Sequence, residues 1–247
     1  MSLDLYPAID LRGGNCVRLM QGDYDRETVY GDDPVSQAKL FADAGAPWIH
    51  VVDLDAARSG DPVNRPVVAA IAAAVDVPVQ TGGGVRTVDA AEALFDVGVT
   101  RVVIGTAAVE NPALAETLTS LGRRVAIGLD GRNGKIATHG WETETDIDVV
   151  DMARRFEDIG VDAVVVTEIA RDGTLEGPDI DGLSTVLSGT TLDVIASGGV
   201  GTTDHLRELA ALRVGDRSLS GVIAGRAIYE GTVDLVDGLA ACAGGVS

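Results

Sequence analysis

Hydrophobic positions alternate between two periodicities along the whole chain. Short apolar runs, typical of buried strands, are followed by longer segments with apolar residues three or four positions apart, typical of helices. This regular alternation of strands and helices indicates a parallel α/β fold. The short runs predict strands at Leu5–Ile9, Ile49–Leu54, Val77–Gln80, Val102–Ile104, Val125–Leu129, Ala163–Thr167, Asp193–Ala196 and Gly221–Ala224. The longer segments predict helices at Pro34–Ala44, Arg65–Ala74, Val88–Val97, Pro112–Leu121, Ile147–Ile159, Ile180–Leu187, Thr203–Leu212 and Val233–Ala241.

The two halves of the chain repeat one another, which favours a closed barrel over an open doubly wound sheet. Leu5–Asp10 and Val125–Asp130 are short apolar runs, 120 residues apart, and both end on an aspartate. The segment Gly82–Gly84 has a glycine-rich counterpart 115 residues later. A length of 247 residues also suits one barrel. We predict a single (β/α)8 TIM barrel domain over residues 1–247, with half-repeats at about 1–121 and 122–247.

The composition is strongly acidic, with a formal net charge of −19. Such a charge argues against nucleic acid and against an anionic membrane surface as partners. Lys39 and Lys135 are the only lysines, so 17 of the 19 basic residues are arginines. An acidic, lysine-poor chain is typical of cytosols at very high salt, where screening removes self-repulsion. We predict a halophilic protein, with an ordinary acidic protein as the alternative.

Other features of the sequence point to a cytoplasmic enzyme. No apolar run reaches the roughly 20 residues that span a bilayer, and the N-terminal residues lack the pattern of a signal peptide. Cys16 and Cys242 are far apart, which suits a reducing compartment and gives no metal-ligand spacing. The chain has no nucleotide-binding fingerprint and no catalytic Ser–His pair. We expect a cytoplasmic monomer that uses no cofactor and no metal.

Glycines follow four of the predicted strands at matched positions in the two halves. Glycine lets backbone N–H groups approach an anion, and the N-terminus of the next helix adds a favourable dipole. One such glycine pair is most often a tight turn, whereas four at matched positions favour two phosphate sites. These sites suit a substrate with a phosphate at each end. The first phosphate site would comprise Gly83, Gly84, Gly105 and Thr106, and the second Gly198, Gly199, Gly225 and Arg226.

Carboxylates follow the first and fifth strands, which lie on opposite sides of a barrel mouth. Asp10 and Asp130 would therefore face a substrate from two sides, as general acid–base catalysis requires. Either aspartate alone could be a turn or capping residue, but their matched placement favours catalysis. Thr167 ends the sixth strand, where it could hydrogen-bond a substrate hydroxyl. Asp172 either shapes a turn or joins the site.

Four further residues are predicted to bind substrate. Arg18, in the long loop after the first strand, could clamp a phosphate bidentately. Trp141, in the loop after the fifth strand, is expected to cover a ring of the ligand. Asp53 ends the second strand and would line the site. His50 begins that strand, where a structural histidine is the more common interpretation.

Six segments of the chain resemble the ProFAR isomerases of histidine biosynthesis, and the resemblance extends over essentially the whole length. It implies a cofactor-free Amadori rearrangement that converts an aminoaldose into an aminoketose. It also implies that Asp10 is the general base, which removes the C2 proton, and that Asp130 is the general acid, which helps to open the furanose ring. The segments are Pro7–Leu11, Val17–Tyr24, His50–Asp55, Gly82–Arg86, Gly140–Trp141 and Arg171–Thr174.

Three other functions remain open. The cyclase of the same pathway shares the barrel and both aspartates, but its first strand and loop differ from the segments around Asp10 and Arg18. Bifunctional isomerases that also process phosphoribosylanthranilate typically have Arg two residues before the tryptophan, where this chain has His139. Single-function isomerases tend to have a small residue there, so His139 fits neither pattern. A non-catalytic barrel that binds sugar phosphates would keep the glycines and need neither aspartate.

Overall fold

Eight parallel strands close into a barrel in the computed structural model, which describes residues 2–244. Each strand pairs with its neighbours in chain order, and the two halves join where β6 pairs with β7 and where β14 pairs with β1. This closure confirms the predicted (β/α)8 barrel and excludes an open sheet. The barrel strands are β1 (Asp4–Arg12), β4 (Ile49–Asp53), β5 (Val79–Gly82), β6 (Arg101–Ile104), β7 (Val125–Arg132), β10 (Ala163–Glu168), β11 (Val194–Ser197) and β14 (Gly221–Ala224).

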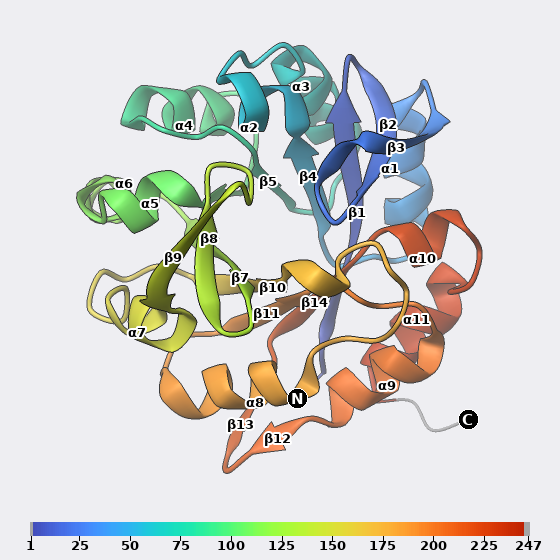
Figure 1. The fold of residues 1–247 in the computed structure, drawn as a ribbon. Coiled ribbons are helices and arrows are strands. Elements are labelled where there is room, and N and C mark those ends of the chain that lie inside the picture. The colour runs from blue at the N-terminus through green and yellow to red at the C-terminus, as the bar shows by residue number, and fades with distance from the viewer. Residues whose placement is uncertain (1, 245–247) are drawn as a thin grey trace.

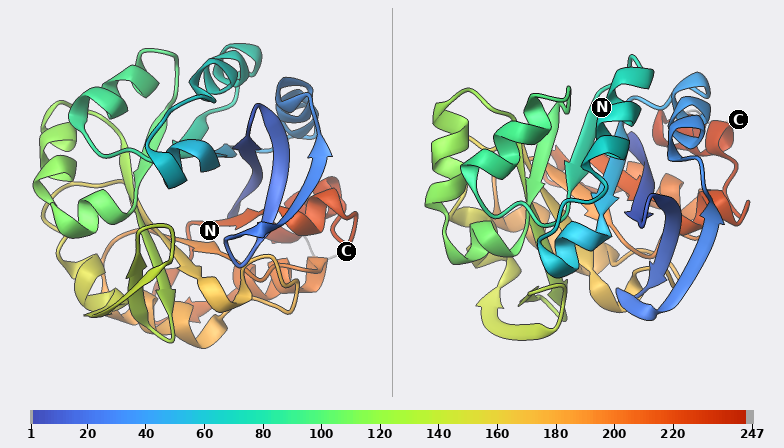
Figure 2. Two further views of the ribbon diagram at one scale, coloured as in Figure 1. Left: turned by 45° about the horizontal axis from the view of Figure 1, so that its top comes forward. Right: turned by 90° about the horizontal axis from the view of Figure 1, so that it is seen from above.

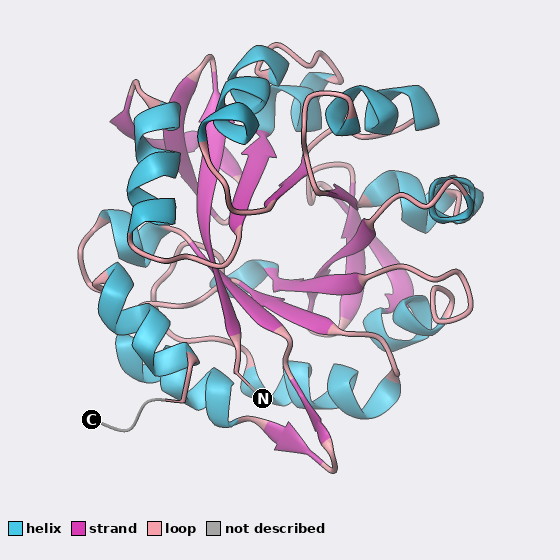
Figure 3. Ribbon diagram, turned by 180° about the vertical axis from the view of Figure 1, so that it is seen from behind, coloured by secondary structure: helices cyan, strands magenta, loops and turns pink. Residues whose placement is uncertain are grey.

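An outer ring of helices surrounds these strands, as Figures 2 and 3 show. N-cap residues mark the starts of several helices. Asp33 accepts a hydrogen bond from the amide of Ser36, and Thr202 accepts one from the amide of His205. Pro34 in the first turn of α1 has the φ that a helix needs. The main helices of the ring are α1 (Pro34–Asp43), α3 (Arg65–Ala74), α4 (Val88–Phe95), α6 (Ala113–Ser120), α7 (Val149–Arg154), α8 (Ile180–Gly189), α9 (Thr203–Ala211) and α11 (Leu235–Cys242).

Two hairpins replace the long loops expected after the first and fifth strands. The first contains β2 (Asn15–Met20) and β3 (Asp23–Gly31), and the second contains β8 (Lys135–Thr138) and β9 (Thr143–Asp148). They form because β1 and β7 continue beyond the barrel and pair with antiparallel partners. The predicted helix Ile147–Ile159 is correspondingly shorter, since its first two residues belong to β9. Both hairpins extend from the same side of the barrel (Figures 1 and 2).

Short elements that the hydrophobic pattern did not predict occupy several connections. Most of them lie directly after barrel strands, where they add to the rim at the C-terminal end of the barrel. β4 ends at Asp53, one residue before the predicted end, because a helix begins at Leu54. These elements are α2 (Leu54–Ser59), α5 (Thr106–Glu110), the 3-10 turn η1 (Ile169–Arg171), α10 (Arg226–Tyr229) and the pair β12 (Arg213–Val214) and β13 (Arg217–Ser218).

The core has two parts, one between strands and helices and one inside the barrel. The outer part contains large side chains such as Phe41 and Phe156, which are almost fully buried. The inner part contains mostly small and branched side chains, with Tyr6 stacked on Trp48 at a centroid distance of 5.5 Å. Side chains therefore fill the lower half of the barrel, as is usual for this fold. A cavity opens at the C-terminal end of the strands.

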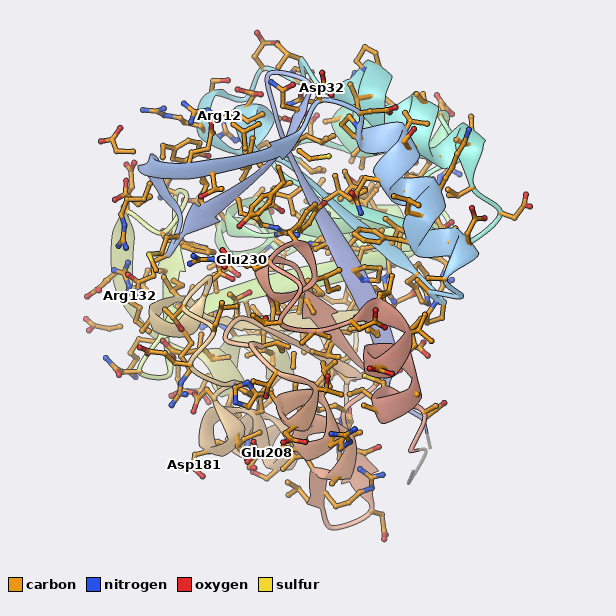
Figure 4. The ribbon with its side chains drawn as sticks, turned by 90° about the vertical axis from the view of Figure 1, so that its right-hand side faces the viewer. Arg12, Asp32, Arg132, Asp181, Glu208 and Glu230 are labelled. Atoms are coloured by element: carbon orange, nitrogen blue, oxygen red, sulfur yellow. The ribbon has the colours of Figure 1, made fainter. Side chains whose placement is uncertain are left out.

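Acidic side chains lie over the outer surface. Asp32, Asp181 and Glu208 are exposed on three different elements or connections (Figure 4). Within residues 2–244, no helix combines the length and the hydropathy that crossing a membrane requires. The halophilic character stays a prediction, since the structure does not test it.

Candidate active site

A cavity of about 630 Å³ opens at the C-terminal ends of the barrel strands. Both halves of the chain contribute to its wall, as the repeat predicts. Every predicted site residue lines this cavity except Asp53. The residues that line it are Asp10, Arg18, His50, Gly83, Gly84, Gly105, Thr106, Asp130, Trp141, Thr167, Asp172, Gly198, Gly199, Gly225 and Arg226.

Asp53 is instead part of the support for α2. Its carboxylate accepts hydrogen bonds from the amide of Ala56 at 3.0 Å and from Nδ2 of Asn64 at 2.7 Å. It is 6% exposed. The prediction of a substrate-binding Asp53 is therefore corrected to a helix-capping role, because the helix that begins at Leu54 turns the carboxylate away from the cavity.

Asp10 lies within β1, where its backbone is in register with Val17 on one side and Val52 on the other. Nη1 of Arg18 lies 2.8 Å from Oδ2 of Asp10, and both side chains are largely buried. Burial raises the pKa of Asp10, and the positive charge and hydrogen bond of Arg18 oppose that rise. The ion pair with Arg18 therefore favours the ionised form of Asp10 against the effect of burial.

Arg18 lies between Asp10 and the second phosphate site. Its guanidinium also donates to the carbonyl oxygen of Ala8 and lies 5.5 Å from the ring centroid of Tyr229. A side chain on Gly225 would overlap the guanidinium, so the two residues are in direct contact. Within the described residues, Nε of Arg18 is buried without a hydrogen-bond partner. Arg18, which was predicted to clamp a phosphate, thus pairs with Asp10 at the edge of the predicted second phosphate site.

Asp130 lies on β7 directly opposite Thr167 on β10. Burial raises the pKa of Asp130, and hydrogen bonds from the side chains of Trp141 and Thr167 oppose the rise. The indole of Trp141 packs on Gly22, where any side chain would overlap the ring. The hairpin after β7 therefore meets the hairpin after β1 over the cavity. This arrangement places the tryptophan at the mouth, as expected for a ring that covers a ligand.

Asp172 combines the two roles that the sequence left open. It follows η1 in a turn, and its carbonyl oxygen accepts a hydrogen bond from the amide of Gln21 at 3.1 Å. Its carboxylate also lines the cavity. The pKa of Asp172 is raised to about 7, first by burial and then by the negative charge of Asp10, with a smaller contribution from Asp130. The site thus contains three carboxylates, and burial raises the pKa of each of them.

The glycines of the two predicted phosphate sites differ in the space that a Cβ atom would have. Gly83 (φ +102°) and Gly199 (φ +86°) lie so close to neighbouring backbone that a Cβ would overlap a carbonyl oxygen. Packing alone therefore requires glycine at these two positions. Gly105 is different, because a Cβ there would meet no atom closer than 4.0 Å. It precedes α5, whose first amide groups have no partner within the helix.

Side chains of the two predicted phosphate sites connect neighbouring loops. Oγ1 of Thr106 accepts a hydrogen bond from the amide of His139 at 2.9 Å. Arg226 donates to the carbonyl oxygen of Gly173 at 2.6 Å and to Oε1 of Glu230 at 2.7 Å. The side chains of Thr106 and Arg226 thus already have partners within the protein.

His139 lies at the mouth of the cavity beside a carboxylate. Its Nε2 is 3.3 Å from Oε1 of Glu110, and both residues line the cavity. Both side chains are more than half exposed. A ligand group that approaches His139 therefore also approaches a negative charge.

Sequence reasoning missed several other residues of the cavity wall. Ser197 is the counterpart of Gly82 in the repeat, so the half-barrel alignment could have identified it. Tyr24 and Arg86 lie within segments that carry the family resemblance but had no assigned role. Asn111 follows α5, and no sequence motif indicated that it would line the cavity.

The chain is similar in sequence to proteins of histidine biosynthesis. The family described as "Histidine biosynthesis protein" matches residues 4–234. A protein of Paracoccus denitrificans (strain Pd 1222) is 49% identical over 240 residues, which cover 97% of this chain and 99% of that protein. It is named 1-(5-phosphoribosyl)-5-((5-phosphoribosylamino)methylideneamino) imidazole-4-carboxamide isomerase. Proteins of the same name in Synechococcus sp. (strain RCC307) and Rhodobacter capsulatus are each 50% identical, over 98% and 96% of this chain and 95% and 98% of their own lengths.

Proposed function

The chain belongs to the histidine biosynthesis protein family, and its relatives at 49–50% identity are ProFAR isomerases. We propose that this chain also catalyses the Amadori rearrangement of ProFAR. ProFAR is the bisphosphate that those relatives' name describes, and the product is the corresponding aminoketose. The observation that carries the proposal is one cavity with three carboxylates between two glycine-rich helix starts. A barrel that only bound sugar phosphates would not need buried carboxylates, whose burial is costly.

The two phosphate sites hold the ends of the substrate. For eight strands about 4.8 Å apart, tilted by about 36°, the barrel is about 15 Å across, so sites over opposite walls lie on the order of 15–20 Å apart. When the two terminal phosphates of the substrate occupy these two sites, the reacting sugar between them lies in the middle of the cavity. Binding energy from the remote phosphate then positions the reacting carbon.

Asp10 removes the proton from C2. The furanose ring first opens when its oxygen is protonated and the bond from C1 to that oxygen breaks, which leaves a protonated imine at C1. Loss of the C2 proton to Asp10 gives an enaminol. That proton then returns to C1 while the proton of the C2 hydroxyl passes back to the acid that opened the ring, which gives the aminoketose. The ion pair with Arg18 supports this role, since it keeps the base ionised before the reaction.

Asp172 is the better donor of the ring-opening proton. The resemblance implies this role for Asp130, whose carboxylate already accepts hydrogen bonds from the side chains of Trp141 and Thr167. The pKa of Asp172, about 7, keeps much of that carboxyl protonated at neutral pH. We therefore assign the acid to Asp172, while Asp130 accepts hydrogen bonds from substrate hydroxyls and holds the sugar against the base.

Asparagine substitutions test the carboxylate roles in a coupled assay with purified protein and ProFAR, read by absorbance. Asp10→Asn and Asp172→Asn, which remove the base and the acid, should each lower kcat by about 10²–10⁴-fold. Asp53→Asn is the matched control, because Asn also caps helices, and it should keep most of the turnover. If Asp10→Asn or Asp172→Asn kept more than about a tenth of the wild-type kcat, that residue would not have its proposed role.

Gly105→Ala tests the first phosphate site without the backbone overlap expected at Gly83. The added methyl group should raise KM for ProFAR strongly, because it crowds the amides at the start of α5. Crystals soaked in phosphate should show one anion near Thr106 and a second near Arg226. Clear density with one site empty, in soaked and in substrate-bound crystals, would contradict the proposed pair of sites.

We also propose that the enzyme acts as a cytoplasmic monomer, in salt-rich conditions, without nucleic-acid or membrane partners. The acidic surface disfavours binding to anionic polymers and lipids. Gel filtration with light scattering measures the oligomeric state directly.

A further inference from the structure

Three polar side chains lie in a row across neighbouring strands beneath the cavity. His50 on β4 is in register with Gln80 on β5, which is in register with Arg101 on β6. Their exposed fractions are 8%, 0% and 4%, in an interior that is otherwise mostly apolar. Of the three, His50 lines the cavity. Buried polar groups of this kind must be hydrogen-bonded, and the pattern of those bonds carries information.

The direction of each hydrogen bond in this row is fixed by Arg101. Its Nε lies 2.6 Å from Oε1 of Gln80, and a guanidinium can only donate. The Gln80 carbonyl must therefore face Arg101, so its amide NH2 faces Nδ1 of His50 at 2.9 Å. Nδ1 must then accept, and the ring hydrogen of a neutral His50 is on Nε2. No assumption about the amide orientation is needed, because the arginine excludes the alternative.

Arg101 itself is held firmly in place. Its Nη2 donates to the hydroxyl of Tyr6 at 3.0 Å, and its guanidinium carbon lies 4.4 Å from the ring centroid of Trp48. Nη1 is 3.9 Å from a carboxylate oxygen of Asp162. With these contacts the guanidinium cannot turn away from Gln80 without losing several partners at once.

His50 stays uncharged in these surroundings. Burial, and to a smaller extent the positive charges of Arg18 and Arg101, together lower the pKa of His50 to about 3. A neutral imidazole with hydrogen on Nε2 is a hydrogen-bond donor that has no acidic proton to lose to Asp10. Such a donor stabilises an oxygen that gains electron density without protonating it.

We propose that Arg101 and Gln80 are positioning residues that hold His50 as the neutral Nε2–H tautomer, which donates to a sugar oxygen of the substrate beside Asp10. His50 is in register with Ala8, two residues before Asp10 on β1, so its ring lies about 7 Å below the base. A sugar carbon that Asp10 deprotonates would have its oxygen near this floor. The inference rests on the proposed isomerase function and adds the residues that prepare one of its hydrogen bonds.

Histidine-selective 15N NMR tests the tautomer in the unmodified enzyme. The chain has three histidines, and the spectrum of His50→Gln assigns the signal of His50. The expected pattern is a neutral Nε2–H imidazole that does not change across the neutral pH range. An Nδ1–H pattern, or an imidazolium signal in that range, would overturn the inference. This readout does not depend on turnover, so it stands apart from a failure of the proposed function.

Two substitutions of His50 test its donor role. Phe has a similar shape without a donor, whereas Gln carries an NH2 group near the position of Nε2. His50→Phe should lower kcat about 10- to 100-fold, as expected for one hydrogen bond to a developing charge. His50→Gln should recover at least half of that loss on a logarithmic scale, with KM little changed in both. Equal kcat for His50→Phe and the wild type would refute the donor role.

Gln80→Glu tests the positioning role with a change of one atom. The carboxylate still accepts from Arg101 but now presents an oxygen to Nδ1, so His50 must put a hydrogen there. The NMR pattern should change and kcat should fall, while KM stays within about threefold of the wild type. An unchanged pattern would remove Gln80 from the role. A changed pattern with wild-type kcat would show that the reaction does not use this tautomer.

Discussion

Asp172→Asn should stabilise the fold while it abolishes most of the turnover. In the folded protein the pKa of Asp172 is raised from 3.8 to about 7, so the fold binds this proton more tightly than the unfolded chain does. The contribution of this carboxyl to stability is therefore complete below the unfolded pKa. It is lost as the pH rises from about 4 to about 7. Asparagine resembles the protonated acid and avoids this loss.

The size of the effect follows from the pKa difference. A rise of about three units corresponds to about 4 kcal/mol at pH 8, at 1.36 kcal/mol per unit. The carboxylate lines an open cavity, where water screens part of its charge, so we expect a gain of about 2 kcal/mol. For a chain of this length each kcal/mol raises Tm by about 2–4 °C, which gives about 4–8 °C at pH 8.

Thermal unfolding of the wild type and of Asp172→Asn at pH 8 and pH 4.5 measures this gain. At pH 4.5 the gain should fall to about a quarter, because the wild-type carboxyl is then protonated in the fold. Asp216→Asn, in the exposed turn between β12 and β13, is the control and should change Tm little at either pH. A lower Tm for Asp172→Asn at pH 8, or an equal gain at both pH values, would refute the raised pKa and with it the assignment of the acid.

Three other changes give measurable results. Arg18→Met should move the acidic limb of kcat/KM upward by about one to three pH units, because Asp10 loses its ion pair, and an unmoved limb would show that Arg18 does not tune the base. Raising KCl from about 0.1 M to about 2 M should raise Tm markedly by screening the net charge of −19, and a flat response would make the acidic composition incidental. Little phosphoribosylanthranilate isomerase activity is expected, since Glu110 beside His139 repels a substrate carboxylate, and complementation of a strain that lacks that isomerase would contradict this.

The hydrophobic pattern by itself determined the order of strands and helices in the barrel. These features depend on local periodicity, which each segment carries in its own residues. Because parallel strands all end at the same rim, the pattern also brought Asp10, Asp130 and Thr167 to one cavity. Boundaries were less well determined: β1 continues to Arg12, beyond the predicted end at Ile9, through pairing with β2 that local sequence did not reveal.

The tertiary structure alone decided which partner each polar group has. Asp53 and Asp10 both end apolar runs, yet one caps a helix and the other faces the cavity with Arg18. The raised pKa of Asp172 is a sum of burial and through-space charges from distant strands, which no local pattern encodes. The tautomer of His50 depends on Arg101, two strands away, through one intervening amide. Such relations arise only when register and closure bring distant residues together, so the sequence identified the site and the fold assigned its chemistry.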